Sequence, residues 1–199
     1  IAISEYIRRR IRRVYDRESH VVYPPVDTDY YTPDGGPRED FFLCVSAAVP
    51  YKRLDIIVEA FNRLGRRLVL IGRGPELPEL RRRARPHVEF RPWVGRHELR
   101  ELYRRAGGFV FAAEEDFGIT PLEAQACGCP VVAFARGGTG ETVLEGQTGR
   151  LFEAQTTESL LGALESFDPA ALDAGVIRRH AEQFAPARFR ENFIAVLRR

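Results

Sequence analysis

Apolar and polar residues change their spacing repeatedly along this chain. From residue 40 onward, short apolar runs typical of buried strands are separated by longer amphipathic stretches typical of helices. The runs expected as strands are 41–46, 67–71, 88–90, 108–112, 130–134 and 151–152, and the stretches expected as helices are 53–64, 76–83, 96–105, 121–127 and several within 157–199. Strands alternating with helices of this length predict an α/β fold with a Rossmann-like, doubly wound parallel sheet.

The first 38 residues follow a different pattern. Residues 1–17 form a basic amphipathic pattern, in which apolar positions recur every three to four residues between arginines, so a helix is expected there. A short strand is expected at 21–23, and 24–39, rich in Pro, Asp and Gly, is expected to be a linker or long loop. The arginines at 8–13 indicate a solvated helix face rather than a nucleic-acid-binding patch. Contact of this helix with an anionic bilayer is a further alternative.

Composition removes several classes of function. The net charge is only +2, so bulk electrostatics gives no case for nucleic-acid binding. The three cysteines lie in or beside apolar segments, and Cys127 and Cys129 are too close in sequence for a zinc pair, so buried reduced thiols and no metal are expected. The four histidines lie outside the loops that follow the strands and are expected to pack or to face solvent. The chain begins at Ile1 and contains no methionine, which predicts a piece of a longer protein.

The segment from Glu115 to Glu123 is the most informative one. Its two acids bracket a Gly-containing loop and the start of a helix, directly after an apolar strand. Thr120 is a candidate N-cap and Glu123 completes a capping box, while Gly128 suits the end of the helix. The free N–H groups of a helix start favour an anion such as a phosphate. The two acids could alternatively be a plain loop acid and a helix cap.

Four loops that follow predicted strands share one sheet edge with this segment. They are 50–53, 72–74, 114–118 and 136–140. Lys52 in the first loop is the only lysine among 30 basic residues, which is either an accident of composition or the mark of a position that needs a compact ammonium. Cations, glycine-rich loops and acids at one edge suit a nucleotide. The sequence lacks both the dinucleotide-binding fingerprint and the P-loop motif. We therefore expect neither NAD binding nor P-loop binding of a nucleoside triphosphate.

Three separated motifs then resemble one known family. The segments 45–55, 71–76 and 115–123 are similar to the C-terminal, donor-binding domain of family 4 glycosyltransferases, and the two acids match that family's E-x7-E motif. The resemblance is closest to the mannosyltransferase-like branch. It implies one half of a GT-B enzyme that transfers a sugar from a nucleotide-sugar to a hydroxyl acceptor with retention. It also divides the chain into the end of the acceptor-side domain and a hinge (1–38), the donor-binding domain (39–185) and a helix returning toward a missing N-terminal domain (186–199).

The resemblance also implies residue roles. Lys52 matches the lysine on the donor diphosphate, Glu115 the acid on the donor sugar, and Glu123 the acid on the ribose; the first two are the expected catalytic residues. Other positions implied to meet the donor are Gly72, Gly74, Val94, Phe117, Gly118, Ile119, Thr120 and Leu122. Many members carry Arg where this chain has Ala47, and Arg53 or Arg73 is expected to replace it. Trp93 is expected in the core.

Partners follow from the same resemblance. No cofactor is expected beyond the nucleotide-sugar, with GDP-mannose favoured, and the acceptor is a glycan or lipid-linked sugar in polysaccharide, O-antigen or glycolipid synthesis. The expected location is the cytoplasm, with peripheral contact to the inner membrane face open. The isolated chain is expected to bind nucleotide weakly and to catalyse little. Alternatives are a GT-B epimerase or phosphorylase and a nucleotide-sugar-binding module without catalysis.

Overall fold

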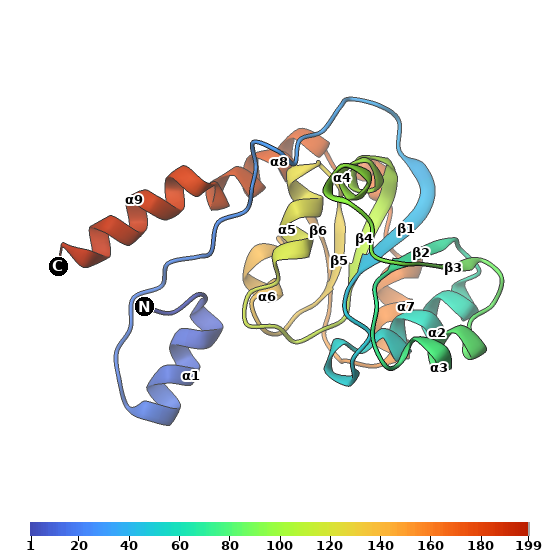
Figure 1. Ribbon diagram of the computed structural model, residues 1–199, viewed down its shortest axis with the longest axis horizontal. Helices are drawn as coiled ribbons and strands as arrows, with labels where there is room; N and C mark the ends of the chain where they lie inside the picture. Colours follow the sequence, from blue (N-terminus) through green and yellow to red (C-terminus); the bar gives the residue numbers. More distant parts are fainter. Residues whose placement is uncertain (199) are drawn as a thin grey trace.

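The computed structural model describes residues 1–198, and within them six strands form one parallel sheet (Figure 1). The strands are β1 Glu39–Val45, β2 Leu68–Ile71, β3 Val88–Arg91, β4 Ala106–Phe111, β5 Val131–Phe134 and β6 Gly149–Phe152. Their order across the sheet is β3-β2-β1-β4-β5-β6, with each neighbouring pair parallel. This is the doubly wound Rossmann order, so the fold predicted from the sequence is confirmed.

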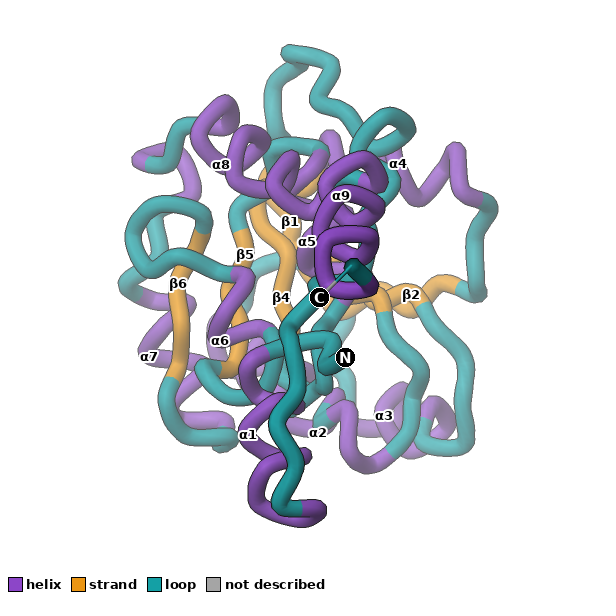
Figure 2. The backbone as a smooth tube through the Cα atoms, turned by 90° about the vertical axis from the view of Figure 1, so that its left-hand side faces the viewer, coloured by secondary structure: helices purple, strands orange, loops and turns teal. Residues whose placement is uncertain are grey.

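Helices cover both faces of this sheet. The helices in residues 1–198 are α1 Glu5–Tyr15, α2 Leu54–Leu64, α3 Leu77–Arg83, α4 Arg96–Arg105, α5 Ile119–Ala126, α6 Thr139–Thr142, α7 Thr157–Glu165, α8 Ala174–Ala181 and α9 Pro186–Leu197, with short 3-10 turns at Pro50–Lys52, Pro169–Ala171 and Glu182–Phe184. Residues of α2, α3 and α7 share one core cluster, whereas residues of α4, α5 and α8 share the other. Figure 2 shows the strands between these two groups of helices.

The central strand β1 explains why the sequence shows continuous apolar runs. Phe42 and Cys44 belong to the core on the α2 side, whereas Phe41, Leu43 and Val45 belong to the core on the α4 side. Since both faces of the strand are buried, both sets of alternating positions must be apolar.

The segment 16–38 is a long loop that includes most of the loop expected at 24–39, although residue 39 already belongs to β1, and it is fastened to the domain. The Arg178 guanidinium donates to the carbonyls of Thr28 and Tyr31, and Arg38 donates to carbonyls around the start of β4. The strand predicted at 21–23 is wrong. This segment lies away from the sheet, next to the residues before α1, and makes a single bridge between Ala2 and Val21.

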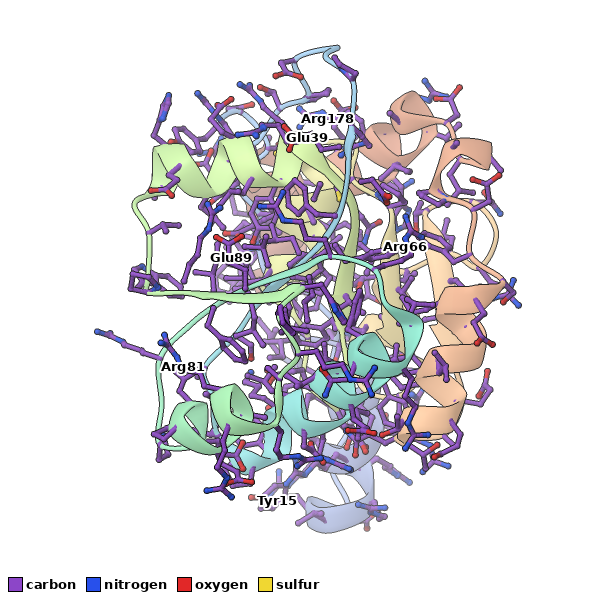
Figure 3. The ribbon with its side chains drawn as sticks, turned by 90° about the vertical axis from the view of Figure 1, so that its right-hand side faces the viewer. Tyr15, Glu39, Arg66, Arg81, Glu89 and Arg178 are labelled. Carbon is purple, nitrogen blue, oxygen red and sulfur yellow. The ribbon has the colours of Figure 1, made fainter. Side chains whose placement is uncertain are left out.

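The two terminal helices lie on one side of the molecule. α1 and α9 both extend from the sheet domain toward the left in Figure 1, where both chain ends lie. In Figure 3, Glu39 at the start of β1 and Arg178 lie at the upper end, and Tyr15 at the end of α1 lies at the lower end. α1 therefore lies toward the edge where the strands finish.

Candidate functional site

A cavity of about 610 Å³ opens at the carboxyl ends of β1 and β4. These two neighbouring strands are the point where the strand order reverses, which is where ligands bind in open α/β sheets. The lining residues come from the loops after β1, β2, β3 and β4 and from the N-terminal segment: Ile3, Pro24, Val45, Ser46, Ala47, Tyr51, Lys52, Arg73, Trp93, Phe111, Glu115, Asp116, Phe117, Gly118, Ile119 and Thr120.

Lys52 and Glu115 form an ion pair inside this cavity. Lys52 ends the 3-10 turn after β1, and its ammonium lies 5.0 Å from the centre of the Tyr51 ring. Glu115 lies in the loop after β4, and the backbone N–H of Gly138 donates to its carbonyl oxygen at 2.8 Å. The side chains of the pair are 15% and 22% exposed, so a ligand entering the cavity can reach both charges.

The start of α5 closes one side of the cavity. The predicted N-cap is wrong, because the helix begins at Ile119 with Gly118 as its cap residue, two positions before the expected Thr120 cap. Gly118 has φ 86°, and a Cβ there would lie 3.0 Å from Thr139, so glycine suits this entry into the helix. Among residues 1–198 no side chain caps α5. Its first N–H groups therefore stay available at the cavity.

Glu123 lies in an adjoining cavity of about 480 Å³. The capping box is absent, because the Tyr103 hydroxyl donates to the Glu123 carboxylate at 3.0 Å instead. Burial raises the pKa of Glu123, and hydrogen bonds from Tyr103 and Tyr31 act in the opposite direction. The residues lining this second cavity are Tyr31, Trp93, Val94, Gly95, Arg96, Leu99, Thr120 and Glu123. Val94 thus lines the same cavity as Glu123.

Trp93 corrects another expectation. It was predicted to be a core residue, yet its side chain is 58% exposed and lines both cavities. Trp93 follows β3, which is the outer strand on its side of the sheet, so the chain leaves the sheet there. The indole lies where the Lys52 cavity meets the Glu123 cavity.

The two arginines proposed to replace the family arginine lie in different environments. Arg73 lines the larger cavity together with Ala47. The Arg53 guanidinium pairs with Asp55 at 3.0 Å and donates to Gln155. Arg73 is therefore the better placed of the two to meet an anion in the cavity.

The remaining predicted residues contribute mainly through the backbone. A Cβ on Gly72 would lie 2.0 Å from the Ser46 carbonyl oxygen, so glycine lets the loop after β2 pack against the loop after β1. Gly74 allows a similar approach to Ala48. Leu122 is fully buried in a small core cluster with Phe117, so its side chain serves packing.

Sequence reasoning missed several groups around the cavities. Tyr103 and Tyr31 face Glu123 from α4 and from the long loop. Arg96 lines the smaller cavity and forms an ion pair with Asp27 at 2.6 Å. The spacing gave no signal for Tyr103, which has the position of an ordinary apolar residue on the buried face of α4.

Glu141 on α6 was also missed. Its carboxylate accepts hydrogen bonds from the N–H groups of Glu5 at 2.8 Å and Tyr6 at 2.6 Å and from the Tyr23 hydroxyl at 3.0 Å. Ile3, which lies just before α1, and Pro24, which lies in the loop after α1, line the larger cavity. Glu141 therefore fixes the N-terminal helix beside the site.

Residues 1–198 lack two features that would suggest other functions. No cluster of three or more His, Cys, Asp or Glu side chains has the arrangement of metal ligands. In the same residues, no helix is both long enough and apolar enough to cross a bilayer.

The chain belongs to a family of glycosyltransferases. Residues 39–167 match the family model described as glycosyl transferases group 1. The chain is also 32% identical, over 89% of its length, to a GDP-mannose-dependent alpha-(1-6)-phosphatidylinositol monomannoside mannosyltransferase of Mycolicibacterium smegmatis, covering 56% of that protein. It is 33% identical over 83% of its length to a D-inositol 3-phosphate glycosyltransferase of Mycobacterium sp. strain KMS, covering 43% of it. The chain thus spans about half the length of these curated relatives.

Solved structures agree on the fold. The lipopolysaccharide outer core galactosyltransferase WaaB superposes with a TM-score of 0.82 at 20% identity, covering 98% of this chain and 60% of that one. Anabaena HepE in complex with UDP and glucose gives 0.84 at 21%, covering 98% and 61%. The fold is that of a GT-B glycosyltransferase domain, as the resemblance implied.

Proposed function

We propose that this chain is the donor-binding domain of a retaining glycosyltransferase that moves a sugar, with mannose favoured, from a nucleotide-sugar to a hydroxyl acceptor. The observation that carries the proposal is the juxtaposition of two cavities at the β1/β4 switch point. One holds Lys52, Glu115 and the uncapped start of α5, and the other holds Glu123. Together they match the parts of a nucleotide-sugar.

Each part of the donor has a complementary group in this arrangement. Lys52, Arg73 and the first N–H groups of α5 offer positive charge to a diphosphate. Glu115 beside Lys52 would accept hydrogen bonds from the sugar, and Glu123 in the adjoining cavity would accept them from the ribose hydroxyls. The exposed Trp93 ring and the backbone of Val94 would meet the base.

The chemistry would be electrostatic stabilisation of the leaving group. The bond between the anomeric carbon and the diphosphate breaks, a new bond forms from that carbon to the acceptor oxygen, and the acceptor proton passes to the departing phosphate. Lys52 and Arg73 would stabilise the negative charge that develops on the diphosphate.

The acceptor, a glycan or lipid-linked sugar, would enter from the side of α1 and of a further domain. The predicted cytoplasmic location and membrane contact stay predictions.

The relatives favour mannose, since the mannosyltransferase named above is described as GDP-mannose-dependent. Calorimetry with GDP-, UDP- and ADP-sugars tests the proposal and names the base. Saturable binding of one sugar-nucleotide, weakened by Lys52→Ala and unchanged by Arg53→Ala, supports it. If every sugar-nucleotide fails to bind while the chain is folded, or if Lys52→Ala binds as wild type, the assignment is wrong.

A further inference from the structure

Glu123 is held by a tyrosine that lies deep in the core. The Tyr103 side chain is fully buried, and its ring packs against Tyr31 and Phe109 at centroid distances of 5.7 Å. Its hydroxyl reaches the Glu123 carboxylate at 3.0 Å. A buried tyrosine hydroxyl needs a polar partner, and here that partner is an acid that opens into the smaller cavity.

The two oxygens of the Glu123 carboxylate differ in their hydrogen-bond partners. Tyr103 donates to Oε2, so Oε1 and the remaining lone pairs of Oε2 are left for other donors. Tyr31 faces the same carboxylate from the long loop and lines the cavity. The acid is therefore fixed from the core side while its other side stays accessible.

The Tyr103 hydroxyl stays protonated and donates its hydrogen bond to the Glu123 carboxylate. Burial, followed by the charge of Glu123, raises the pKa of Tyr103 well above its ordinary value. Burial likewise raises the pKa of Tyr31 to about 12. Both hydroxyls keep their protons at neutral pH, so each donates to Glu123 and stabilises the ionised form of its carboxylate.

We propose that Tyr103 is a positioning residue: its hydroxyl holds Glu123 in the orientation that receives the 2′- and 3′-hydroxyls of a ribose, so that the site selects ribonucleotides over deoxynucleotides. This inference rests on the proposed function, which places the nucleoside in the smaller cavity. A freely rotating Glu123 would lose side-chain entropy on binding, whereas the fixed carboxylate has already lost it.

The experiment compares the affinity of the full chain for GDP and UDP with that for their 2′,3′-dideoxy counterparts, by calorimetry. In the wild type we expect the ribonucleotide to bind about ten- to a hundred-fold more tightly, as hydrogen bonds to a charged group allow. Tyr103→Phe keeps the ring and removes the hydroxyl, so we expect the ratio to fall several-fold through weaker ribonucleotide binding, with dideoxynucleotide binding unchanged. If Tyr103 has only a structural role, Tyr103→Phe weakens the binding of ribonucleotide and dideoxynucleotide equally and leaves the ratio of their affinities unchanged. That result would overturn the proposal.

Two further variants separate the possible failures. Tyr6→Phe is the matched control, because it removes a tyrosine-to-glutamate hydrogen bond of 2.8 Å at Glu114, and its ratio should equal that of the wild type. Glu123→Gln should bring the ratio close to one. If Glu123→Gln keeps the wild-type ratio, the ribose role in the proposed function is wrong. If Glu123→Gln lowers the ratio and Tyr103→Phe does not, the positioning role alone is wrong.

A crystal structure of the wild-type chain with the tighter-binding nucleotide gives a second measurement that does not depend on the stability of the variant. The proposal predicts that the Tyr103 hydroxyl stays on Glu123 while the carboxylate holds the ribose hydroxyls. A carboxylate that turns away from Tyr103 to reach the ribose contradicts it.

Discussion

Lys52 and Glu115 form an ion pair although they lie 63 positions apart in the sequence. The pair joins the loop after β1 to the loop after β4, across the middle of the sheet. Under the proposed function, a donor diphosphate replaces Glu115 as the partner of Lys52. Glu115 is then free to accept hydrogen bonds from the sugar. In this structure the two charges are each other's partners.

The first prediction concerns these two residues. Lys52→Ala and Glu115→Ala in the intact enzyme should each lower kcat/KM for sugar transfer by about a hundred- to a thousand-fold, the scale found when one group that stabilises developing charge is removed. Steady-state transfer assays measure the loss, and circular dichroism checks that the fold is kept. Activity close to wild type in either variant would sink the catalytic assignment.

The second prediction compares Arg73 with Arg53. Arg73 lines the cavity, whereas Arg53 is paired with Asp55 outside it. Arg73→Ala should weaken GDP or UDP binding by about ten-fold or more, because a hydrogen bond from a charged donor contributes about 1.5–3 kcal/mol. It should hardly affect the nucleoside without phosphates. Arg53→Ala serves as the control and should bind as wild type; the reverse order of effects would assign the missing family arginine to Arg53.

The third prediction is a pH dependence of nucleotide binding. Burial raises the pKa of Glu123, so this acid takes up its proton at a higher pH than an ordinary glutamate. If the ribose needs the carboxylate, affinity should fall as the pH is lowered through this raised pKa and should be constant above it. Tyr103→Phe removes a hydrogen bond that opposes the rise, so the fall should begin at a still higher pH.

Binding titrations across the pH range measure this dependence. The charged and titratable groups around the carboxylate are Tyr103, Tyr31, Arg96 and Asp27. Glu123→Gln isolates the contribution of Glu123, since its affinity should lack this pH step. A step of equal size in Glu123→Gln would attribute the titration to a group other than Glu123.

The fourth prediction concerns the attachment of α1. Glu141 accepts two N–H groups from the first turn of α1 and the hydroxyl of Tyr23. Glu141→Ala removes a capping carboxylate, whose loss typically costs about 0.5–2 kcal/mol. Amide hydrogen exchange in α1 should therefore accelerate several-fold or more, while exchange in β1 and β4 stays unchanged. Equal protection of α1 in both proteins would show that other contacts hold this helix.

The sequence was sufficient for the sheet and for much of the site. The apolar runs predicted all six strands because both faces of a parallel sheet are buried, and the spacing of Glu115 and Glu123 located the loop and helix after β4. The resemblance then indicated which side chains to look for. Lys52 and Glu115 do meet in the structure.

The errors arose where tertiary packing decides the outcome. Thr120 and Glu123 have the spacing of a capping box, but Gly118 starts the helix earlier and Tyr103 engages the carboxylate. Trp93 has a large apolar side chain of the kind expected in a core, but it follows an outer strand and stays exposed. Tyr103 lies 20 residues before Glu123, and its hydroxyl partner could not be inferred from its apolar position on α4.

Trp93 offers the most direct test of the central claim, that the paired cavities bind a nucleotide-sugar. It is the only tryptophan in the sequence and lines both cavities, so its fluorescence reports on a ligand there. Titrating the 199-residue chain with GDP-mannose and with UDP-glucose, up to millimolar concentrations, should give a saturable change in Trp93 emission for one of them. Lys52→Ala should shift that titration to at least about ten-fold higher concentration, as loss of a charge-assisted hydrogen bond implies. An emission that stays constant with both sugar-nucleotides, or a titration that Lys52→Ala leaves unchanged, would contradict the account.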